Sequence, residues 1–239
     1  MKVLIVYAHQ EPKSFNGAML ERAQSALTRQ GHEVRVSDLY AMGFKAVADA
    51  ADFEGRANPD FFKYQAEQTA AVKAGTLAAD IRAEQEKVFW CDLLVLQFPL
   101  WWFGLPAIMK GWVDRVFTMG NVYGSGLLYD TAGFRGRRAM LALTTGGPPT
   151  MYAPNGRNGD IEKILFPINH GMLAFTGFTV LQPFVAWSVA RAGDDARRAY
   201  LDEYEARLLA ASSATPIAYP TMAEFDEKMQ LREPGRILI

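Results

Sequence analysis

Short apolar runs alternate with helical patterns along the chain. Runs of β-branched and aliphatic residues are typical of buried parallel strands, and alternation of apolar with polar residues is typical of half-buried strands. These patterns predict strands at residues 3–7, 33–37, 92–97, 138–144 and 179–186. Pro183 places the last of these toward an edge of the sheet, because proline cannot donate to a strand ladder.

Apolar residues spaced three and four apart predict the helices between these strands. The first helix follows Asn16, which we expect to be its N-cap, and ends at Gly31. The others are predicted at residues 78–89, 108–117, 160–176 (with Asp160 as cap) and 194–211. Residues 38–76 are less regular and indicate an insertion with short helical pieces.

Five strands that alternate with helices favour an α/β fold, specifically a doubly wound five-stranded parallel sheet with an insertion after the second strand. Residues 1–211 form one predicted domain. Residues 212–239 contain three prolines and are predicted to be an extended tail that packs on the surface or on a dimer partner.

Composition narrows the classes of partner and compartment. The 239 residues are 50% hydrophobic and carry a formal net charge of -1, which gives no electrostatic reason to expect nucleic acid or an anionic membrane. The most apolar stretch, residues 93–108, is interrupted by glycine and prolines and is too short to span a bilayer. The lone cysteine, Cys91, suits a reducing compartment, so we expect a cytoplasmic protein. The three histidines are far apart in sequence, and no cluster has the spacing of metal ligands.

Three loops lie at the carboxyl ends of predicted strands, where open α/β sheets bind their ligands. The first loop offers His9, Lys13, Ser14 and Asn16, which could donate to a pyrophosphate together with the free amides of a helix start. Helix capping with surface polarity explains this loop equally well. The chain has neither the glycine pattern of dinucleotide-binding domains after its first strand nor a P-loop, which argues against both classes.

The second and third loops suggest a flat ligand. Trp101, Trp102 and Phe103 stand together at a strand-to-helix turn and could form core, a subunit interface or a wall for a flat ring. The third loop could present the amides of Thr145, Gly146 and Gly147, since the following prolines have none. Tyr152 could donate its phenol to developing negative charge, or it could be an ordinary surface tyrosine.

These residues carry a family resemblance. The chain resembles the FAD-dependent NAD(P)H:quinone oxidoreductases of flavodoxin-like fold, the DT-diaphorase-like enzymes, from Met1 to about Leu208. The matching motifs occur in one order: Tyr7-Ala-His9, Ser14-Phe-Asn16, residues 37–42, residues 97–117, Thr144-Thr-Gly-Gly147, Met151-Tyr152 and Asp195-Ala-Arg197.

The resemblance implies a role for each matching residue. It implies that FAD is held at its diphosphate and adenine by His9, Ser14, Phe15, Asn16 and Arg197. It implies an isoalloxazine site of Leu100, Trp101, Trp102, Phe103, Thr144, Thr145, Gly146, Gly147 and Tyr152. It implies a substrate enclosure of Trp102, Tyr123 and Phe175, and a homodimer with active sites at the subunit interface. The expected reaction is a ping-pong hydride transfer from NADH or NADPH to a quinone, with Tyr152, Gly146 and Asn158 in the catalytic positions.

The sequence departs from the family pattern in the third loop and near the substrate. Asn158 stands where well-known members have a histidine, and asparagine cannot carry a proton as imidazolium does. Ser125 replaces a second substrate tyrosine, which should open the pocket. Two other functions remain open at this point: an FMN-dependent azo- or nitroreductase, and a regulatory flavodoxin-like subunit of a potassium-efflux system.

Overall fold

The order in which strands are added to the sheet reverses near its centre. In the computed structural model, which describes residues 1–233, the parallel strands follow the order β2-β1-β3-β4-β5, and β6 also pairs with β4. The strands are β1 Lys2–Tyr7, β2 Glu33–Asp38, β3 Leu93–Pro99, β4 Arg138–Thr144, β5 Thr179–Val180 and β6 Phe184–Ala186. The chain leaves β1 toward β2 and then returns to add β3 on the other side. This switch point lies between β1 and β3, where a crevice forms at the carboxyl ends.

The predicted fifth strand is wrong as a single element. The structure divides it into β5 and β6, which pair with opposite ends of β4 in the parallel sense. Gln182 and Pro183 lie between the two, and proline cannot contribute an N–H to the ladder. The prediction of an edge position is confirmed.

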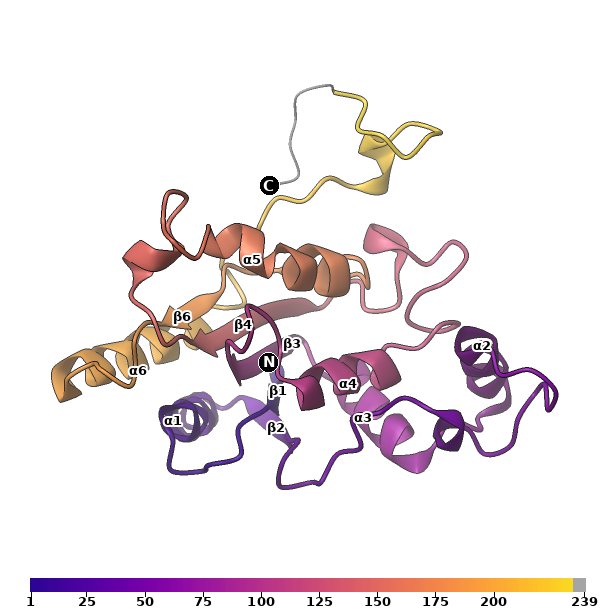
Figure 1. The fold of residues 1–239 in the computed structure, drawn as a ribbon, viewed down its shortest axis with the longest axis horizontal. Coiled ribbons are helices and arrows are strands. Elements are labelled where there is room, and N and C mark those ends of the chain that lie inside the picture. The colour runs from indigo at the N-terminus through magenta and orange to yellow at the C-terminus, as the bar shows by residue number, and fades with distance from the viewer. Residues whose placement is uncertain (234–239) are drawn as a thin grey trace.

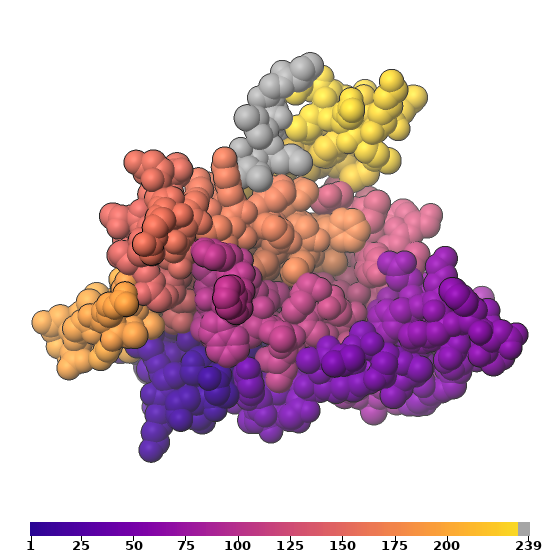
Figure 2. Space-filling model, in the orientation of Figure 1, coloured from indigo at the N-terminus to yellow at the C-terminus, as the bar shows by residue number. Residues whose placement is uncertain are grey.

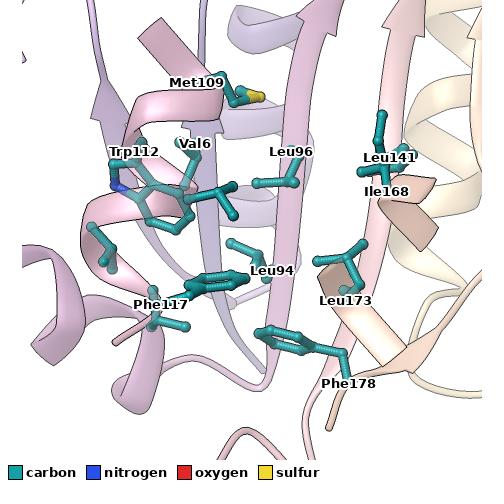
Figure 3. Packing of buried hydrophobic residues seen from close by; sticks show 14 of the residues in the cluster. Val6, Leu94, Leu96, Met109, Trp112, Phe117, Leu141, Ile168, Leu173 and Phe178 are labelled. Carbon is teal, nitrogen blue, oxygen red and sulfur yellow. The ribbon is translucent and has the colours of Figure 1, made fainter. Parts of the chain in front are cut away.

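Helices cover both faces of the sheet (Figure 1). They are α1 Phe15–Arg29, α2 Tyr64–Ala74, α3 Ala79–Trp90, α4 Ala107–Val116, α5 Ile161–Ile168 and α6 Asp194–Leu209. One core layer joins α1 and α6 to the sheet, with Ile5, Met19 and Tyr204 among its buried members. The other joins α3, α4 and α5 to the opposite face, and Figure 3 shows Leu96, Trp112 and Leu173 packed within it. Figure 2 shows α1 and α6 together at one end of the molecule and the insertion after β2 at the other.

Two helix boundaries differ from the sequence prediction. Asn16 is not the N-cap of α1, because Ser14 caps the helix by accepting the N–H of Gly17 at 3.2 Å. Asn16 instead lies in the first turn, with its side chain buried. The helix predicted at 160–176 begins after its predicted cap, Asp160, but becomes a π-helix from Asn169 to Ala174. Such wider turns inside helices frequently occur at functional sites.

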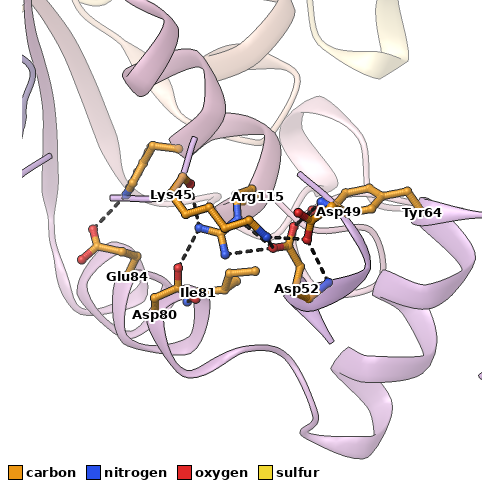
Figure 4. A network of polar contacts seen from close by, with 10 residues as sticks. Lys45, Asp49, Asp52, Tyr64, Asp80, Ile81, Glu84 and Arg115 are labelled. Carbon is orange, nitrogen blue, oxygen red and sulfur yellow. Dashed lines mark hydrogen bonds and ion pairs between the residues drawn. The ribbon is translucent and has the colours of Figure 1, made fainter. Parts of the chain in front are cut away.

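The insertion after β2 is tied to the sheet layer by a buried cation (Figure 4). Arg115 of α4 is 1% exposed and contacts Asp52 at 2.9 Å and Asp80 at 2.7 Å. Burial alone would raise the pKa of Asp52, but hydrogen bonds from Arg115, Tyr64 and Lys45 hold that pKa below its usual value. This network fixes the insertion beside α4, because removing one partner would leave a buried charge unpaired.

The C-terminal segment begins on the sheet edge. Ile217 donates its N–H to Val180 at 2.8 Å, and Pro216 bridges to Leu181 in the antiparallel sense. The last part of the predicted tail, residues 234–239, lies outside the described residues. Among residues 1–233, no helix is long and apolar enough to cross a membrane.

Candidate active site

A groove of about 500 Å³ opens at the carboxyl ends of β1, β3 and β4. Its walls come from the loop after β1, the start of α1, the ends of β3 and β4, and the segment before α6. The lining residues are His9, Lys13, Ser14, Phe15, Asn16, Ala18, Pro99, Thr144, Val189, Ala190 and Arg197. The structure therefore brings together all five residues predicted at the flavin diphosphate and adenine.

A buried chain of hydrogen bonds crosses the sheet beneath this groove. The Tyr204 hydroxyl donates to Gln97 Oε1 at 3.0 Å, and Gln97 Nε2 donates to the Asn16 carbonyl at 2.6 Å. Asn16 Nδ2 in turn donates to Thr144 Oγ1 at 2.9 Å. The chain joins α6, β3, α1 and β4, so four elements hold the groove floor in one geometry.

The groove is lined by donors suited to an anion. The amides of Phe15 and Asn16 stand in the first turn of α1, where helical N–H groups have no partner within the helix. Glu11 donates its N–H to His9 Nδ1 at 3.0 Å, which leaves the imidazole proton on Nε2. Burial lowers the pKa of His9, so the ring is a neutral donor at pH 7. Lys13, from the loop after β1, and Arg197, from α6, supply positive charge to the lining.

One polar atom of the groove lacks a partner. Asn16 Oδ1 is buried and accepts no hydrogen bond from residues 1–233. A buried acceptor without a donor is costly and calls for a ligand or water. With the free amides and the two cations, this donor set fits the diphosphate of a dinucleotide with hydroxyls beside it.

The predicted aromatic wall is a strained, exposed turn. Trp101 and Gly104 exchange backbone hydrogen bonds of 3.2 and 2.9 Å. Between them, Trp102 and Phe103 have φ of 50° and 59°, a conformation that glycine and asparagine adopt most readily. Trp102 is 97% exposed. Bulky residues in this conformation on the surface indicate a functional constraint rather than packing.

The glycine loop, residues 145–147 directly after β4, offers fewer free amides than the sequence predicted. Thr145 uses its N–H to bind the Ala186 carbonyl at 3.0 Å, so the prediction that it donates to a ligand is wrong. Its hydroxyl donates to the Gly147 carbonyl at 2.9 Å and shapes the loop. Gly146 faces open space, whereas a Cβ at Gly147 would lie 3.2 Å from the Tyr152 ring. The amides of this loop that remain as candidate donors are thus those of Gly146 and Gly147.

Tyr152 is held at the edge of this loop. Its ring lies 5.5 Å from that of Trp187 between centroids, and it is 8% exposed. Asn158 donates its N–H to the Met151 carbonyl at 2.8 Å, which closes the loop next to Tyr152. The 3₁₀ turn Pro149–Tyr152 and this contact shape the backbone that carries the Tyr152 ring.

The predicted substrate pair is assembled, but apart from the groove. Tyr123 and Phe175 have ring centroids 5.9 Å apart, and Tyr129 packs against Phe175 at 5.5 Å. Gln65 of α2 donates to the Tyr123 hydroxyl at 3.3 Å. In Figure 1 the loop of residues 121–136, in pink, lies away from α1 and α6, which flank the groove.

Several site residues escaped the sequence analysis. Pro99, Val189 and Ala190 line the groove, and Trp187 supports Tyr152. Gln97 entered the sequence analysis only as the first residue of the motif at residues 97–117. A buried amide at the end of an apolar strand is itself a signal, because it must find partners.

Comparison with known proteins places this geometry in a family. A family model described as flavodoxin-like fold matches residues 1–208. NAD(P)H dehydrogenase [quinone] 1 of Cavia porcellus is 44% identical over 230 residues, which cover 96% of this chain and 84% of that protein. Human ribosyldihydronicotinamide dehydrogenase [quinone] is 45% identical over 217 residues, covering 90% and 94%.

A solved structure agrees with these relatives. A Klebsiella pneumoniae protein assigned as a quinone reductase superposes with a TM-score of 0.95 at 41% identity, over 99% of this chain and 97% of that one. The match of sequence and fold leads to one conclusion: the chain belongs to the flavodoxin-like family.

Proposed function

We propose that the protein is an NAD(P)H:quinone oxidoreductase that uses FAD. The observation that carries the proposal is the position of Thr144. Its side chain is bound by Asn16 at the groove, and the glycine loop with Tyr152 begins at the next residue. Donors for a diphosphate and donors for a ring edge therefore lie on two sides of one strand end. The names of the relatives support a quinone as the acceptor.

The extent of the groove favours FAD over FMN. A single phosphate would need only the first turn of α1 and its neighbours. The groove continues to Val189, Ala190 and Arg197, so a second phosphate and an adenosine have room and a cation of their own. His9 and Ser14 would hold the first phosphate, and Phe15 would pack near the adenosine.

A bound flavin supplies a ring position that accepts hydride from a nicotinamide and gives it to a quinone. The protein supplies the electrostatics around that ring. Gly146, Gly147 and Tyr152 would donate hydrogen bonds at the ring edge, where they would stabilise negative charge. Leu100, Trp101 and Phe103 position the ring, and Trp102 covers the stacked substrate and excludes water. A single site that serves both substrates in turn gives ping-pong kinetics.

The separated aromatic pair supports a homodimer. Tyr123 and Phe175 carry the apolar and hydroxyl groups needed to enclose a quinone, yet they lie away from the groove of their own chain. In a homodimer they would complete the site of the partner. The single cysteine, Cys91, is buried and in no disulfide, which suits a cytoplasmic location.

Asn158 would replace the family histidine without its charge. Its backbone already holds the Tyr152 turn, and its side chain can hydrogen-bond but cannot take up a proton. Proton delivery in this protein would then depend on Tyr152 and solvent.

Two measurements test the proposal together. Mass spectrometry of the cofactor released from the purified protein should give FAD, and a steady-state assay with NADPH and menadione should show rapid turnover. Release of FMN with preferred reduction of azo dyes would replace the proposal with the azoreductase function. Flavin binding with negligible turnover of every acceptor would favour a regulatory subunit.

A further inference from the structure

The segment between β6 and α6 forms a second strained turn that contacts the site at two points. Ser188 has φ of 50°, and its carbonyl accepts the N–H groups of Arg191 and Ala192 at 2.8 and 3.0 Å. Arg197 binds the Val189 carbonyl through Nε and Nη2, both at 3.2 Å. A non-glycine residue in this conformation persists only where its surroundings fix it. We call residues 187–191 the Ser188 turn.

One end of the Ser188 turn contacts Tyr152, and the other end contacts the glycine loop. Trp187 packs on the Tyr152 ring, with 5.5 Å between centroids. Arg191 directs Nη1 to the Gly146 carbonyl at 3.4 Å. The turn thus places an arginine beside the loop that borders the ring site.

The charge of Arg191 is not used within the described chain. Arg197 pairs with Asp194 and Arg198 pairs with Asp195, whereas Arg191 has no carboxylate partner among residues 1–233. Its side chain is exposed, and its one recorded side-chain contact is a long bond to a neutral carbonyl. A guanidinium held in this way has most of its donors free for an anion.

The flavin diphosphate is not the anion that Arg191 fits. The groove has its own cations, Lys13 and Arg197, and Arg191 does not line it. Arg191 stands outside the groove at Gly146, the residue of the glycine loop that faces open space. An anion bound there would belong to a molecule that enters after the flavin.

The names of the relatives differ in the hydride donor, which is the substrate that could carry a phosphate. Some are named for NAD(P)H, which has a diphosphate, and others for ribosyldihydronicotinamide, which has no phosphate. The chain is 44% and 45% identical to these two kinds, so identity does not separate them.

We infer that Arg191, positioned by the Ser188 turn, binds the diphosphate of the hydride donor and selects dinucleotides over phosphate-free dihydronicotinamides. The inference rests on the proposed function. Because the diphosphate is common to both dinucleotides, Arg191 serves NADH and NADPH alike. Planar, two-pronged binding of phosphate oxygens is the chemistry for which arginine is best suited.

The test compares two donors in Arg191→Gln holoenzyme. We expect KM for NADH and for NADPH to rise about tenfold or more, as loss of a charge-assisted hydrogen bond predicts, with kcat unchanged. KM for 1-benzyl-1,4-dihydronicotinamide, which lacks phosphate, should change less than about twofold, since that donor never reaches the guanidinium. Arg191→Lys should recover part of the loss, because it keeps the charge without the fork.

Arg198→Gln is the matched control. It removes the same charge from an exposed arginine close in sequence that is already paired with Asp195, and it should leave every KM unchanged. Equal KM increases for both kinds of donor in Arg191→Gln would mean that Arg191 only supports the glycine loop. Unchanged KM for the dinucleotides would exclude contact with their phosphates. Either result overturns the inference.

A binding measurement separates this inference from the proposed function. Calorimetric titration of the flavin-loaded protein with NAD⁺ requires no turnover, and Arg191→Gln should weaken binding about tenfold relative to the unchanged protein. If the unchanged protein reduces no quinone with any donor, the proposed function fails, yet this titration still decides the role of Arg191. Equal affinities in the titration would overturn the inference.

Discussion

The two halves of the candidate site are built in opposite ways. The groove at the strand ends stands on a buried chain of hydrogen bonds from Tyr204 through Gln97 and Asn16 to Thr144, with every link at 3.0 Å or less. The aromatic turn stands on two backbone hydrogen bonds and carries Trp102 almost fully exposed in a left-handed conformation. One half is rigid and polar, and the other is strained and apolar.

The difference follows from what each half must recognise. A diphosphate requires donors fixed in advance, because reorganising dipoles would cost much of the binding energy. A flat ring requires apolar surface, which is stabilised only when the ligand or a second subunit covers it. Under the proposed function, the ordered hydrogen bonds would lie beneath the phosphates and the exposed apolar surface would lie beside the ring.

Two tryptophans of one segment show the same contrast. Trp112 is 0% exposed and donates Nε1–H to Glu84 at 2.8 Å within the core. Trp102 touches solvent over nearly its whole surface. Residue type alone does not distinguish these two roles.

The largest effect should come from breaking the rigid half. Gln97→Leu leaves the buried Tyr204 hydroxyl without its acceptor and removes the donor to the Asn16 carbonyl. We expect the free energy of unfolding to fall by about 3 kcal/mol, together with weaker flavin binding. Chemical denaturation measures the first quantity and flavin titration the second. A variant as stable as the parent would show that the chain of hydrogen bonds does not hold the groove.

Loss of the Tyr152 hydroxyl should lower the rate by a comparable free energy without changing the stability of the protein. Tyr152→Phe removes a phenol donor and keeps the ring against Trp187. We expect quinone turnover to fall roughly a hundredfold, equivalent to ~3 kcal/mol, while flavin content and the melting temperature stay unchanged. Stopped-flow kinetics of each half-reaction checks this. Undiminished turnover would remove Tyr152 from the mechanism.

The strained half should respond in the opposite sense to the rigid half. Trp102→Gly removes the strain of a left-handed conformation, which costs a residue with a side chain about 1–2 kcal/mol. Glycine itself loses about 0.5–1 kcal/mol in backbone entropy on folding. Stability should therefore stay level or rise by about 1 kcal/mol, while kcat/KM for quinone falls. Trp112→Ala is the control and should lose about 3–5 kcal/mol from the core. A large loss of stability in Trp102→Gly would contradict the assignment of strain to function.

The smallest effect concerns the segment that carries Phe175. His170 stacks on Phe166 with 4.7 Å between centroids, and burial lowers its pKa. The folded state thus binds a proton less readily than the unfolded state, so stability is lost as the pH falls from about 6.5, the unfolded value, through the folded pKa. His170→Phe keeps the stack and removes this titration. Melting temperatures at pH 7.5 and 5 should differ less in the variant, and an equal difference would mean that other groups dominate.

Elements of the fold were predictable where a sequence pattern has a single physical cause. Buried parallel strands need continuous apolar runs, so β1, β3 and β4 were located within two residues at each end. Five groove residues were predictable through the family motifs, and the structure brings them together: His9, Ser14, Phe15, Asn16 and Arg197. The division of the fifth strand, the capping by Ser14 and the loss of the Thr145 amide were not, because each depends on which of several possible hydrogen bonds forms. The Ser188 turn was equally hidden, since a positive φ at serine has no signature in sequence.

One measurement tests the central account most directly: the absorbance near ~450 nm, where oxidised flavins absorb, of the purified protein after it has been supplemented with FAD and the unbound FAD has been removed by desalting. Under anaerobic conditions, NADPH added in equal amount should abolish this band, and menadione added afterward should restore it without further donor. Absence of the band after adding FAD, or a band that NADPH and NADH leave unchanged, would contradict the assignment of the groove and its glycine loop to a flavin that carries hydride between two substrates.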